Sequence, residues 1–439
     1  MLNNSVPGKI YLDYAATTPL RAEVLKEMLP YLTEAFGNAS SLSSLGVEAK
    51  RALEKARAEI AHSIGAEPDE IVFTSGGTES DNLAIQGIGV ANLNRGNHIL
   101  TSSIEHLAVL NPCRFMEKLG FRVTYLPVDR YGRVDPEEVI KRITSKTVLI
   151  SVMHANNEIG TIQPVQEIGR MAQDRGIIFH TDAIQTVGKL PVDVRELHVD
   201  SLSISGHKVY GPKGVGALFV RKGIKISPLL FGGGQEKGIR SGTENVAGIV
   251  GLAKAIELAA AERESEAKRE AGLREMLFKG LSERIEDIHL NGHPVHRLPG
   301  NLHLSFSGID ARKLIPALDE RGIAVSRGSA CSSLQSHPSH VLKAIGLPNS
   351  LALGAVRITL GLHTIAADIE RALNCLPGLI DEGRKAGIGK DVQDELFRER
   401  IEEAGRKEGC ESVRQMAWSF VFKKVSKKIF RSARSANKI

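Results

Sequence analysis

Cysteine, tryptophan and long apolar runs are all scarce in this chain of 439 residues. The four cysteines, Cys113, Cys331, Cys375 and Cys410, are scattered and form no Cys-x-x-Cys pair, which argues against a disulfide framework and a thiolate metal cage. No apolar stretch approaches the roughly 20 residues that cross a membrane. The first residues show no charged segment followed by an apolar run, so we expect no secretory signal and a cytoplasmic protein.

The composition is that of an ordinary globular protein, with 42% hydrophobic and 25% charged residues. Its length suggests two or three domains. Between residues 98 and 185 short apolar segments alternate with segments of helical periodicity. Strands are predicted at 98–102, 121–126, 148–153 and 177–180, and helices at 108–119, 135–143 and 164–175. This alternation predicts an α/β fold with a mostly parallel sheet wrapped by helices.

The stretch 199–216 carries the most informative lysine. A predicted strand at 200–205 ends at Gly206, and His207, Lys208 and a glycine-rich loop follow. In open α/β sheets ligands bind outside the carboxyl ends of the strands. A lysine there is partly desolvated, which lowers its pKa and makes its amine a nucleophile suited to Schiff-base chemistry. A lone loop lysine is more often a surface residue, so this hypothesis depends on its neighbours.

The neighbours strengthen the hypothesis. A predicted strand at 71–74 runs into the glycine and hydroxyl residues 75–82 and then into a helix predicted from Leu83, which is typical of an anion site but is equally compatible with a simple helix cap. Polar side chains also follow several predicted strands: His106, Asn157, Asp182, Gln185 and Lys208. Since the ends of parallel strands meet at one edge of a sheet, we expect these five residues to lie together.

The second half of the chain begins with a long helix predicted over 245–285, which would connect two domains. Residues 286–385 are predicted to form a second α/β unit, with strands at 301–306 and 356–359. Between these strands, Cys331 stands in a run of small polar residues, 326–338, unlike the apolar surroundings of a structural cysteine. We therefore interpret Cys331 as a candidate reactive thiol.

Nine segments of the chain together resemble the cysteine desulfurases, enzymes of the class-V aminotransferase family that use pyridoxal 5'-phosphate and supply sulfur for iron–sulfur cluster assembly. They are YLDYAATTP, FGNASS, EIVFTSGGTESDNLAI, HANNEIGTIQP, HTDAIQTVGKLPVD, SISGHKVYGPKGVGAL, GGGQEKGIRSGTEN, SRGSACSS and VRITLG. The resemblance covers about residues 9–380. It implies a fold-type I transferase with a large cofactor-binding domain at 18–265. A smaller α/β domain, formed by 1–17 and 266–385, would carry a cysteine loop of the long type.

The resemblance also assigns roles to single residues. Lys208 would form a Schiff base with the cofactor and shuttle protons, Asp182 would pair with the pyridinium nitrogen, and His106 would stack on the ring. Gln185 would bind the phenolic oxygen, and Thr243 would reach the phosphate of a neighbouring subunit, which makes the working unit a homodimer. The phosphate site would comprise Gly77, Thr78, Ser205, Gly206 and His207. Asn157, beside the cofactor, and Arg357 would bind the substrate carboxylate, with Asn38 as a further candidate.

The reaction that the resemblance implies starts from L-cysteine. Cys331 would take the substrate sulfur as a persulfide, L-alanine would leave, and the sulfur would pass to an acceptor such as an iron–sulfur scaffold protein. No intrinsic metal site is expected, although Cys331 could share a cluster with a scaffold. Related alternatives are a selenocysteine lyase and an aminotransferase, the latter disfavoured because a transaminase does not need Cys331. A non-catalytic assembly subunit is disfavoured by the intact Lys208, Asp182 and Cys331.

The tail, residues 386–439, does not resemble the family. Its last part, 423–439, has seven basic residues and no acidic one, and apolar residues around it follow helix-like spacing. One interpretation is a basic amphipathic helix for an acidic partner or a membrane surface. The other is a partly disordered extension. No nucleic-acid partner is expected, because no folded recognition motif accompanies the charge.

Overall fold

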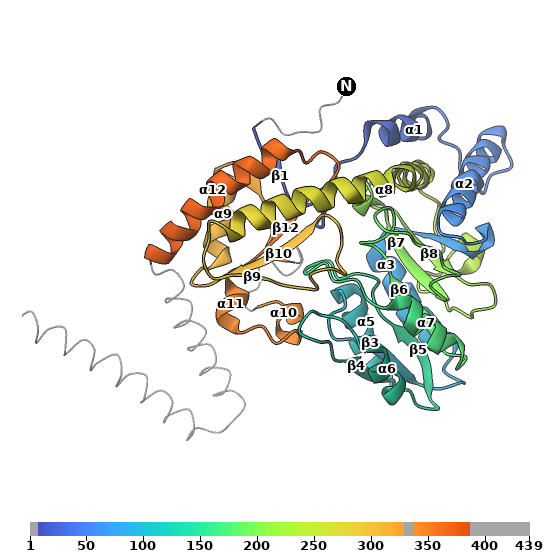
Figure 1. Cartoon of the computed structure of the whole chain (residues 1–439). Coiled ribbons are helices and arrows are strands. Elements are labelled where there is room, and N and C mark those ends of the chain that lie inside the picture. Colours follow the sequence, from blue (N-terminus) through green and yellow to red (C-terminus); the bar gives the residue numbers. More distant parts are fainter. Residues whose placement is uncertain (1–7, 329–337, 387–439) are drawn as a thin grey trace, which may run out of the picture.

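The computed structural model describes residues 8–328 and 338–386, and its centre is a seven-stranded sheet (Figure 1). In spatial order the strands are β2 (Ile71–Thr74), β8 (Gly216–Val220), β7 (Ser201–Ser205), β6 (Ile178–Asp182), β5 (Thr147–Ser151), β3 (His98–Ser102) and β4 (Arg122–Leu126). Strand β8 runs antiparallel to both of its neighbours, and the other pairs are parallel. The prediction of a mostly parallel sheet is confirmed.

Helices cover both faces of this sheet because its strands are apolar on both sides. Adjacent strand residues such as Val72 and Phe73 belong to different hydrophobic clusters, as the period-two geometry of a strand requires. One face packs against α5 (Leu107–Lys118) and the helical segment α3 (Gly77–Asn82), η2 (Leu83–Ile88) and α4 (Gly89–Ala91). The other face packs against α1 (Ala22–Thr33), α2 (Ser44–Ser63), α6 (Pro136–Arg142), α7 (Val165–Gln173) and the start of α8.

A second unit has its own sheet and hydrophobic cluster. Strands β12 (Ala355–Thr359), β10 (Asn301–Phe306) and β9 (Ile288–Leu290) form an antiparallel sheet, while β1 (Ile10–Tyr11) pairs with β11 (Ile323–Ala324). The helices here are α9 (Ala311–Glu320), α10 (His340–Ala344), α11 (Asn349–Leu353) and α12 (Ala366–Lys385). Ile10 and Leu12 are buried in this cluster, so the start of the described chain packs with residues 277–380.

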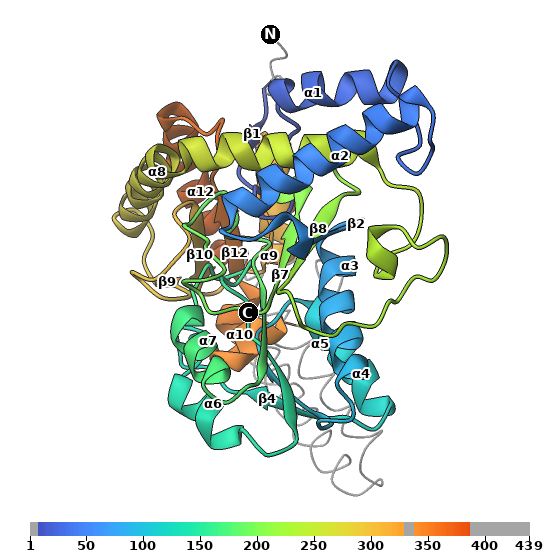
Figure 2. The same ribbon diagram turned by 90° about the vertical axis from the view of Figure 1, so that its right-hand side faces the viewer.

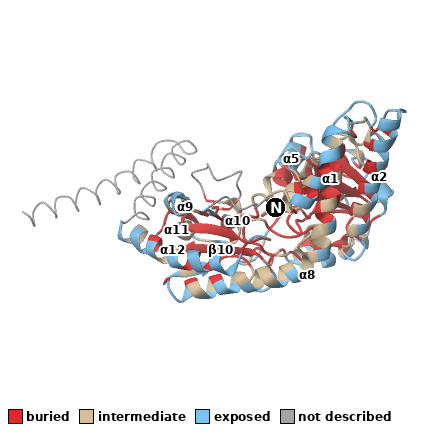
Figure 3. Cartoon of the chain, turned by 90° about the horizontal axis from the view of Figure 1, so that it is seen from above, coloured by how far each residue is buried: buried red, intermediate tan, exposed pale blue. Residues whose placement is uncertain are grey.

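Helix α8 (Val246–Ser282) is a single helix of 37 residues that joins the two units (Figure 1). Near its start, Ile249, Leu252 and Ile256 are buried in the cluster of the large sheet, while Leu277 and Leu281 are buried in the second cluster. The residues between them are mostly half-buried or exposed, as Figure 3 shows. Figure 2 shows α1 and α2 lying along the first half of α8. The predicted connecting helix is therefore present, and the expected boundary at 265/266 lies inside it.

One helix begins earlier than predicted. The prediction placed its start at Leu83, but α3 begins at Gly77. Residues 77–82 lack apolar periodicity because the buried side of this segment is polar. Ser80, for example, is fully buried and donates to the carbonyl oxygen of Ala217 (3.1 Å).

In the described ranges, no helix combines the length and apolar character needed to cross a membrane.

Candidate active site

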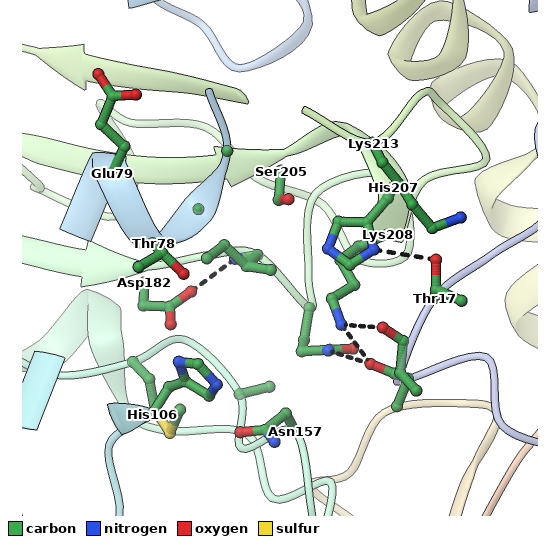
Figure 4. Close-up of a pocket in the computed structure, with 18 of the residues that line it drawn as sticks. Thr17, Thr78, Glu79, His106, Asn157, Asp182, Ser205, His207, Lys208 and Lys213 are labelled. Atoms are coloured by element: carbon green, nitrogen blue, oxygen red, sulfur yellow. Dashed lines mark hydrogen bonds between the residues drawn. The ribbon is translucent and has the colours of Figure 1, made fainter. Parts of the chain in front are cut away.

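A cavity of about 480 Å³ opens at the carboxyl ends of the parallel strands (Figure 4). The structure brings nine of the predicted site residues together in its lining: Gly77, Thr78, His106, Asn157, Asp182, Gln185, Ser205, His207 and Lys208. Arg357 joins them from β12 of the second unit. The expectation that polar residues after separate strands meet at one edge is confirmed by this geometry.

Lys208 ends the short helix η3 (Gly206–Lys208), directly after β7. Its Nζ donates to the carbonyl oxygens of Ala15 (2.6 Å) and Ala16 (2.7 Å), which fixes the amine at the cavity wall (Figure 4). Burial lowers the pKa of Lys208 to about 7, and the nearby positive charges of Arg357 and Lys189 add to this effect. An amine with such a pKa is substantially neutral near pH 7 and can act as a nucleophile.

Asp182 is the last residue of β6 and is almost fully buried. One carboxylate oxygen accepts a hydrogen bond from the backbone N–H of Ile184 (2.9 Å). Burial raises the pKa of Asp182 to about 6, with that hydrogen bond and the charge of Lys208 opposing the rise. A buried acid that lines a cavity is stabilised in its ionised form by a cationic ligand group such as a protonated ring nitrogen.

His106 caps the start of α5, where its Nδ1 accepts a hydrogen bond from the N–H of Ala108 (3.1 Å). Burial lowers the pKa of His106 to about 4, and the positive charges of Lys208 and His340 contribute to this lowering. The imidazole is therefore neutral at physiological pH and carries its proton on Nε2. A neutral aromatic ring in the cavity wall is suited to stacking on a flat ligand.

The other end of the cavity is built for an anion. Gly77 begins α3, and a Cβ at this position would lie 2.1 Å from Cδ1 of Ile184, so any larger residue would force the Ile184 side chain to move. Thr78 and Ser205 add hydroxyl groups to the lining, and Lys213 adds a positive charge. These groups, with the free backbone N–H groups of the helix start, fit a phosphate. His207 lies beside them, with its Nδ1 3.1 Å from Oγ1 of Thr17.

Arg357 reaches the cavity as one of the most buried side chains in the described chain. Its Nη1 donates to the carbonyl oxygen of Asn157 (2.9 Å), and its Nη2 forms an ion pair with Asp13 (2.8 Å). Its Nε makes no hydrogen bond with any residue in the described ranges. The guanidinium is therefore held rigidly and keeps hydrogen-bonding capacity for a carboxylate ligand.

Three predicted residues among those the structure describes do not line this cavity: Gly206, Asn38 and Thr243. Gly206 lies under it, between Ser205 and His207. Asn38 is exposed, and its side chain accepts a hydrogen bond from the N–H of Ser40 (2.9 Å). Thr243 is exposed and lines a smaller cavity of about 110 Å³, which shares Ser75 and Gly214 with the main one. Cys331 lies outside the described residues.

Other contributors were not predicted. The backbone carbonyls of Ala15 and Ala16 hold Lys208, and Asp13 holds Arg357. All three lie just after β1, in the YLDYAATTP segment that resembles the family. Their roles could not be predicted from the sequence, because Asp13 meets Arg357 only through a contact 344 residues apart in the sequence.

Comparison with known proteins agrees with this site. Residues 10–372 match the aminotransferase class-V family. The chain is 55% identical to a cysteine desulfurase IscS from Dictyoglomus turgidum over 376 residues, which are 86% of this chain and 95% of the relative. Among solved structures, it is similar to a NifS-like protein, with a TM-score of 0.80, 39% identity, and coverage of 85% and 99% of the two chains. It is also similar to SspA in complex with cysteine, with a TM-score of 0.73, 41% identity, and coverage of 81% and 99%.

The chain therefore belongs to the aminotransferase class-V family. Its architecture is that of a fold-type I enzyme that depends on pyridoxal 5'-phosphate. The cavity fits that cofactor, since a partly neutral lysine, a buried carboxylate and an anion-binding helix start all face one space. The relative from Dictyoglomus turgidum carries the name of a desulfurizing member of the family.

Proposed function

We propose that this protein is a cysteine desulfurase, which removes sulfur from L-cysteine, releases L-alanine and passes the sulfur on for iron–sulfur cluster assembly. The observation that carries the proposal is the convergence of Lys208, Asp182 and Arg357 on one cavity in a chain 55% identical to a cysteine desulfurase. The first two residues suit the cofactor and the third suits an amino-acid carboxylate. The similar structure of SspA, which was solved in complex with cysteine, supports the same substrate.

The cofactor would be held by the residues already described. When bound, pyridoxal phosphate supplies a carbonyl for Schiff-base formation and a ring that accepts electrons as substrate bonds break. Lys208 would provide the amine for attachment and would then move protons to and from the substrate. Asp182 would keep the ring nitrogen protonated, Gln185 would donate to the phenolic oxygen, and His106 would stack on the ring. The phosphate would be held by Gly77, Thr78, Ser205, Gly206 and His207.

The substrate carboxylate would lie against Arg357 and Asn157, which orients the sulfur toward the open side of the cavity. The thiolate of Cys331 would attack that sulfur, forming a new S–S bond while the C–S bond of the substrate breaks. The carbon fragment takes up a proton and leaves as alanine, and Cys331 keeps the sulfur as a persulfide. Asn38 is a further candidate for carboxylate binding, from a neighbouring loop or subunit.

We also propose a division into domains and a homodimeric working unit. A cofactor-binding domain at 18–265 and a smaller domain formed by 1–17 and 266–385 are supported by the two separate hydrophobic clusters. The dimer is supported by exposed apolar side chains near both the Asn38 and the Thr243 segments. Leu42 is 99% exposed, Phe231 84% and Phe36 69%, and the proposed dimer contact would cover apolar surface of this kind.

The remaining proposals concern partners and location. The acceptor would be an iron–sulfur scaffold protein that approaches Cys331, and the enzyme would act in the cytoplasm, where free thiols persist. The buried Cys113 and the partly buried Cys375 are both unpaired, in keeping with a reducing compartment. Residues 387–439 of the tail lie outside the described residues, and the tail keeps both of its interpretations, a binding helix and a disordered extension.

Alanine release from L-cysteine tests the proposal directly. The purified protein and its Cys331→Ala variant are compared, with visible spectra recorded for both. We expect a yellow, active wild type and a yellow variant that loses at least about a hundredfold in rate, because the nucleophile is removed while the cofactor site stays intact. A yellow wild type that makes no alanine from cysteine would overturn the desulfurase assignment and leave the cofactor assignment standing.

A further inference from the structure

A second, much smaller cavity of about 40 Å³ lies behind the active site, on the side of α8. Lys189 and Glu270 both contribute to its lining. Lys189 follows the β6 loop of the active site, and Glu270 comes from the middle of α8. The cavity has room for a bridging water molecule. Lys189 has so far only its effect on the pKa of Lys208, and Glu270 has no part in the chemistry described above, so the position of these two titratable groups needs an explanation.

The explanation lies in the side chain of Gln185, which lines the active-site cavity and contacts Lys189 in the lining of the smaller one. On one side its Nε2 donates to the carbonyl oxygen of Ala15 (3.1 Å), the same oxygen that accepts from Lys208. On the other side its Oε1 accepts from Nζ of Lys189 (3.3 Å). A flipped amide would place an NH₂ against an amine and an oxygen against a carbonyl, which are two mismatched contacts. Lys189 and Ala15 together therefore permit one amide orientation.

Two of the three acids that line the small cavity with Lys189 already have a cationic partner. Of the acids that line the small cavity, Glu262 pairs with Arg21 (2.6 Å) and Glu266 with Arg269 (2.6 Å). Glu270 forms no ion pair within 4 Å among residues 8–328 and 338–386. The other ionisable groups in the lining are Arg263 and Tyr210, and from the active site Arg357 and Lys208 also act on this position.

Glu270 is thus the acid that offsets the charge of Lys189. Burial lowers the pKa of Lys189, and the charge of Glu270 opposes that change. Burial in turn raises the pKa of Glu270 to about 7, and Lys189 opposes it. Each group favours the ionised form of the other across the same small space.

We propose that Lys189 is a positioning residue, whose amine holds the Gln185 amide with its NH₂ group toward the active-site cavity and the phenolic oxygen of the cofactor. Glu270 supplies the opposing charge from α8. This inference rests on the proposed cofactor geometry at Gln185. Lys189 would then be a cationic group behind the cofactor that acts through the amide of Gln185. Through Glu270, the middle of α8 would also be coupled to the active site.

The bound cofactor itself provides the readout. Its visible absorbance is titrated with pH in the holoenzyme, without substrate, for wild type, Lys189→Met and Lys189→Arg. Loss of the amine frees the amide and removes a positive charge, so we expect the titration midpoint of Lys189→Met to rise by about one unit. Lys189→Arg keeps a cationic donor and should stay close to wild type. Lys55→Met, a change at an exposed lysine of α2, is the matched control and should not shift the midpoint.

A second comparison separates positioning from simple charge. The Lys189→Met change is repeated in a Gln185→Ala background, where we expect less than half of the original shift, because the residue through which Lys189 acts is gone. An unchanged midpoint in Lys189→Met, or an undiminished shift in the Gln185→Ala background, would overturn the proposal. If Lys189→Met does not fold, Lys189→Gln serves in both comparisons. Alanine release is not used here, so failure of this inference is distinct from failure of the desulfurase assignment.

Discussion

Lys208 shows how strongly one side chain depends on its surroundings. Its pKa is near 10.4 in an unfolded chain, whereas burial lowers it to about 7 in the fold. Between these two pH values the unfolded chain binds more protons than the folded one. The contribution of Lys208 to the free energy of unfolding must therefore rise with pH across this range, and it is least favourable below pH 7.

We expect this effect in the cofactor-free protein, where the amine of Lys208 is free to titrate. Between pH 7 and pH 9.5 the melting temperature of Lys208→Met should rise less, or fall more, than that of the wild type, by about 1 °C for each kcal/mol of the Lys208 contribution removed. Thermal unfolding followed at several pH values is the measurement. Lys55→Met, which changes an exposed lysine, should keep the wild-type slope. Equal slopes for Lys208→Met and wild type would contradict the assignment of a buried, partly neutral amine.

The sequence predicted the residues of this site that stand directly after strands, and it did so for a physical reason. Strand ends are marked by a change from apolar to polar residues, and parallel strands must bring their ends to one edge. Lys208, Asp182 and Gln185 were identified in this way. Lys189 carries no such mark, because it stands one turn beyond Gln185 and its role depends on Glu270, which the fold brings in from α8.

At the scale of elements, the segment 231–245 is rich in glycine, a composition typical of a flexible connection. In the structure it is fastened at Glu236, within the short helix η4 (Glu236–Gly238). The Glu236 carboxylate accepts two hydrogen bonds from Arg57 of α2 (2.6 and 2.8 Å) and one from the N–H of Phe73 in β2 (2.8 Å). Both charged side chains are nearly fully buried. Glu236 also has a positive φ of 47°, a costly conformation that these three bonds hold in place.

We therefore expect Glu236→Gln to destabilise the fold by about 3 kcal/mol, because it removes the buried counter-charge of Arg57 and leaves its guanidinium only the half-exposed carboxylate of Glu54 (3.2 Å). The same substitution at Glu67, whose ion pair with Arg195 is largely exposed, should cost no more than about 1 kcal/mol. Urea unfolding of the two variants beside wild type gives both values. A loss at Glu236 no larger than at Glu67 would show that the segment is not anchored there.

How well an element could be predicted from the sequence depends on whether its own residues show a clear apolar pattern. Strands such as 71–74 and 98–102 were found within a residue because each is a short apolar run with both faces buried. Helix α3 was missed because its buried face is polar and carries Ser80 and Asp81. The sequence could not predict that Glu236 anchors this segment, because its partner Arg57 lies 179 residues away and neither residue has an unusual local pattern.

At the scale of the whole molecule, the open question is which active site Thr243 serves. Thr243 is exposed, which favours the proposed contact with a neighbouring subunit. Its cavity nonetheless shares Ser75 and Gly214 with the active site of its own chain. The two arrangements have different consequences in a dimer, because a residue that acts across the interface can be supplied by the other subunit.

Mixed dimers of Lys208→Ala and Thr243→Ala subunits distinguish these arrangements. If Thr243 serves the neighbouring site, a mixed dimer has one intact site, formed by the Lys208 of one subunit and the Thr243 of the other. Unfolding and refolding the two variants together in equal amounts should then restore about a quarter of the wild-type alanine release, since half of the dimers are mixed and each has one working site. If Thr243 serves its own chain, every site in the mixture lacks one residue or the other, and the rate stays at the average of the separate variants. Refolding each variant alone controls for losses in the procedure, and light scattering confirms that the refolded species is a dimer. Restored activity would also establish the homodimer as the working unit, because two separate monomers, each lacking one of the two residues, could not form a complete site.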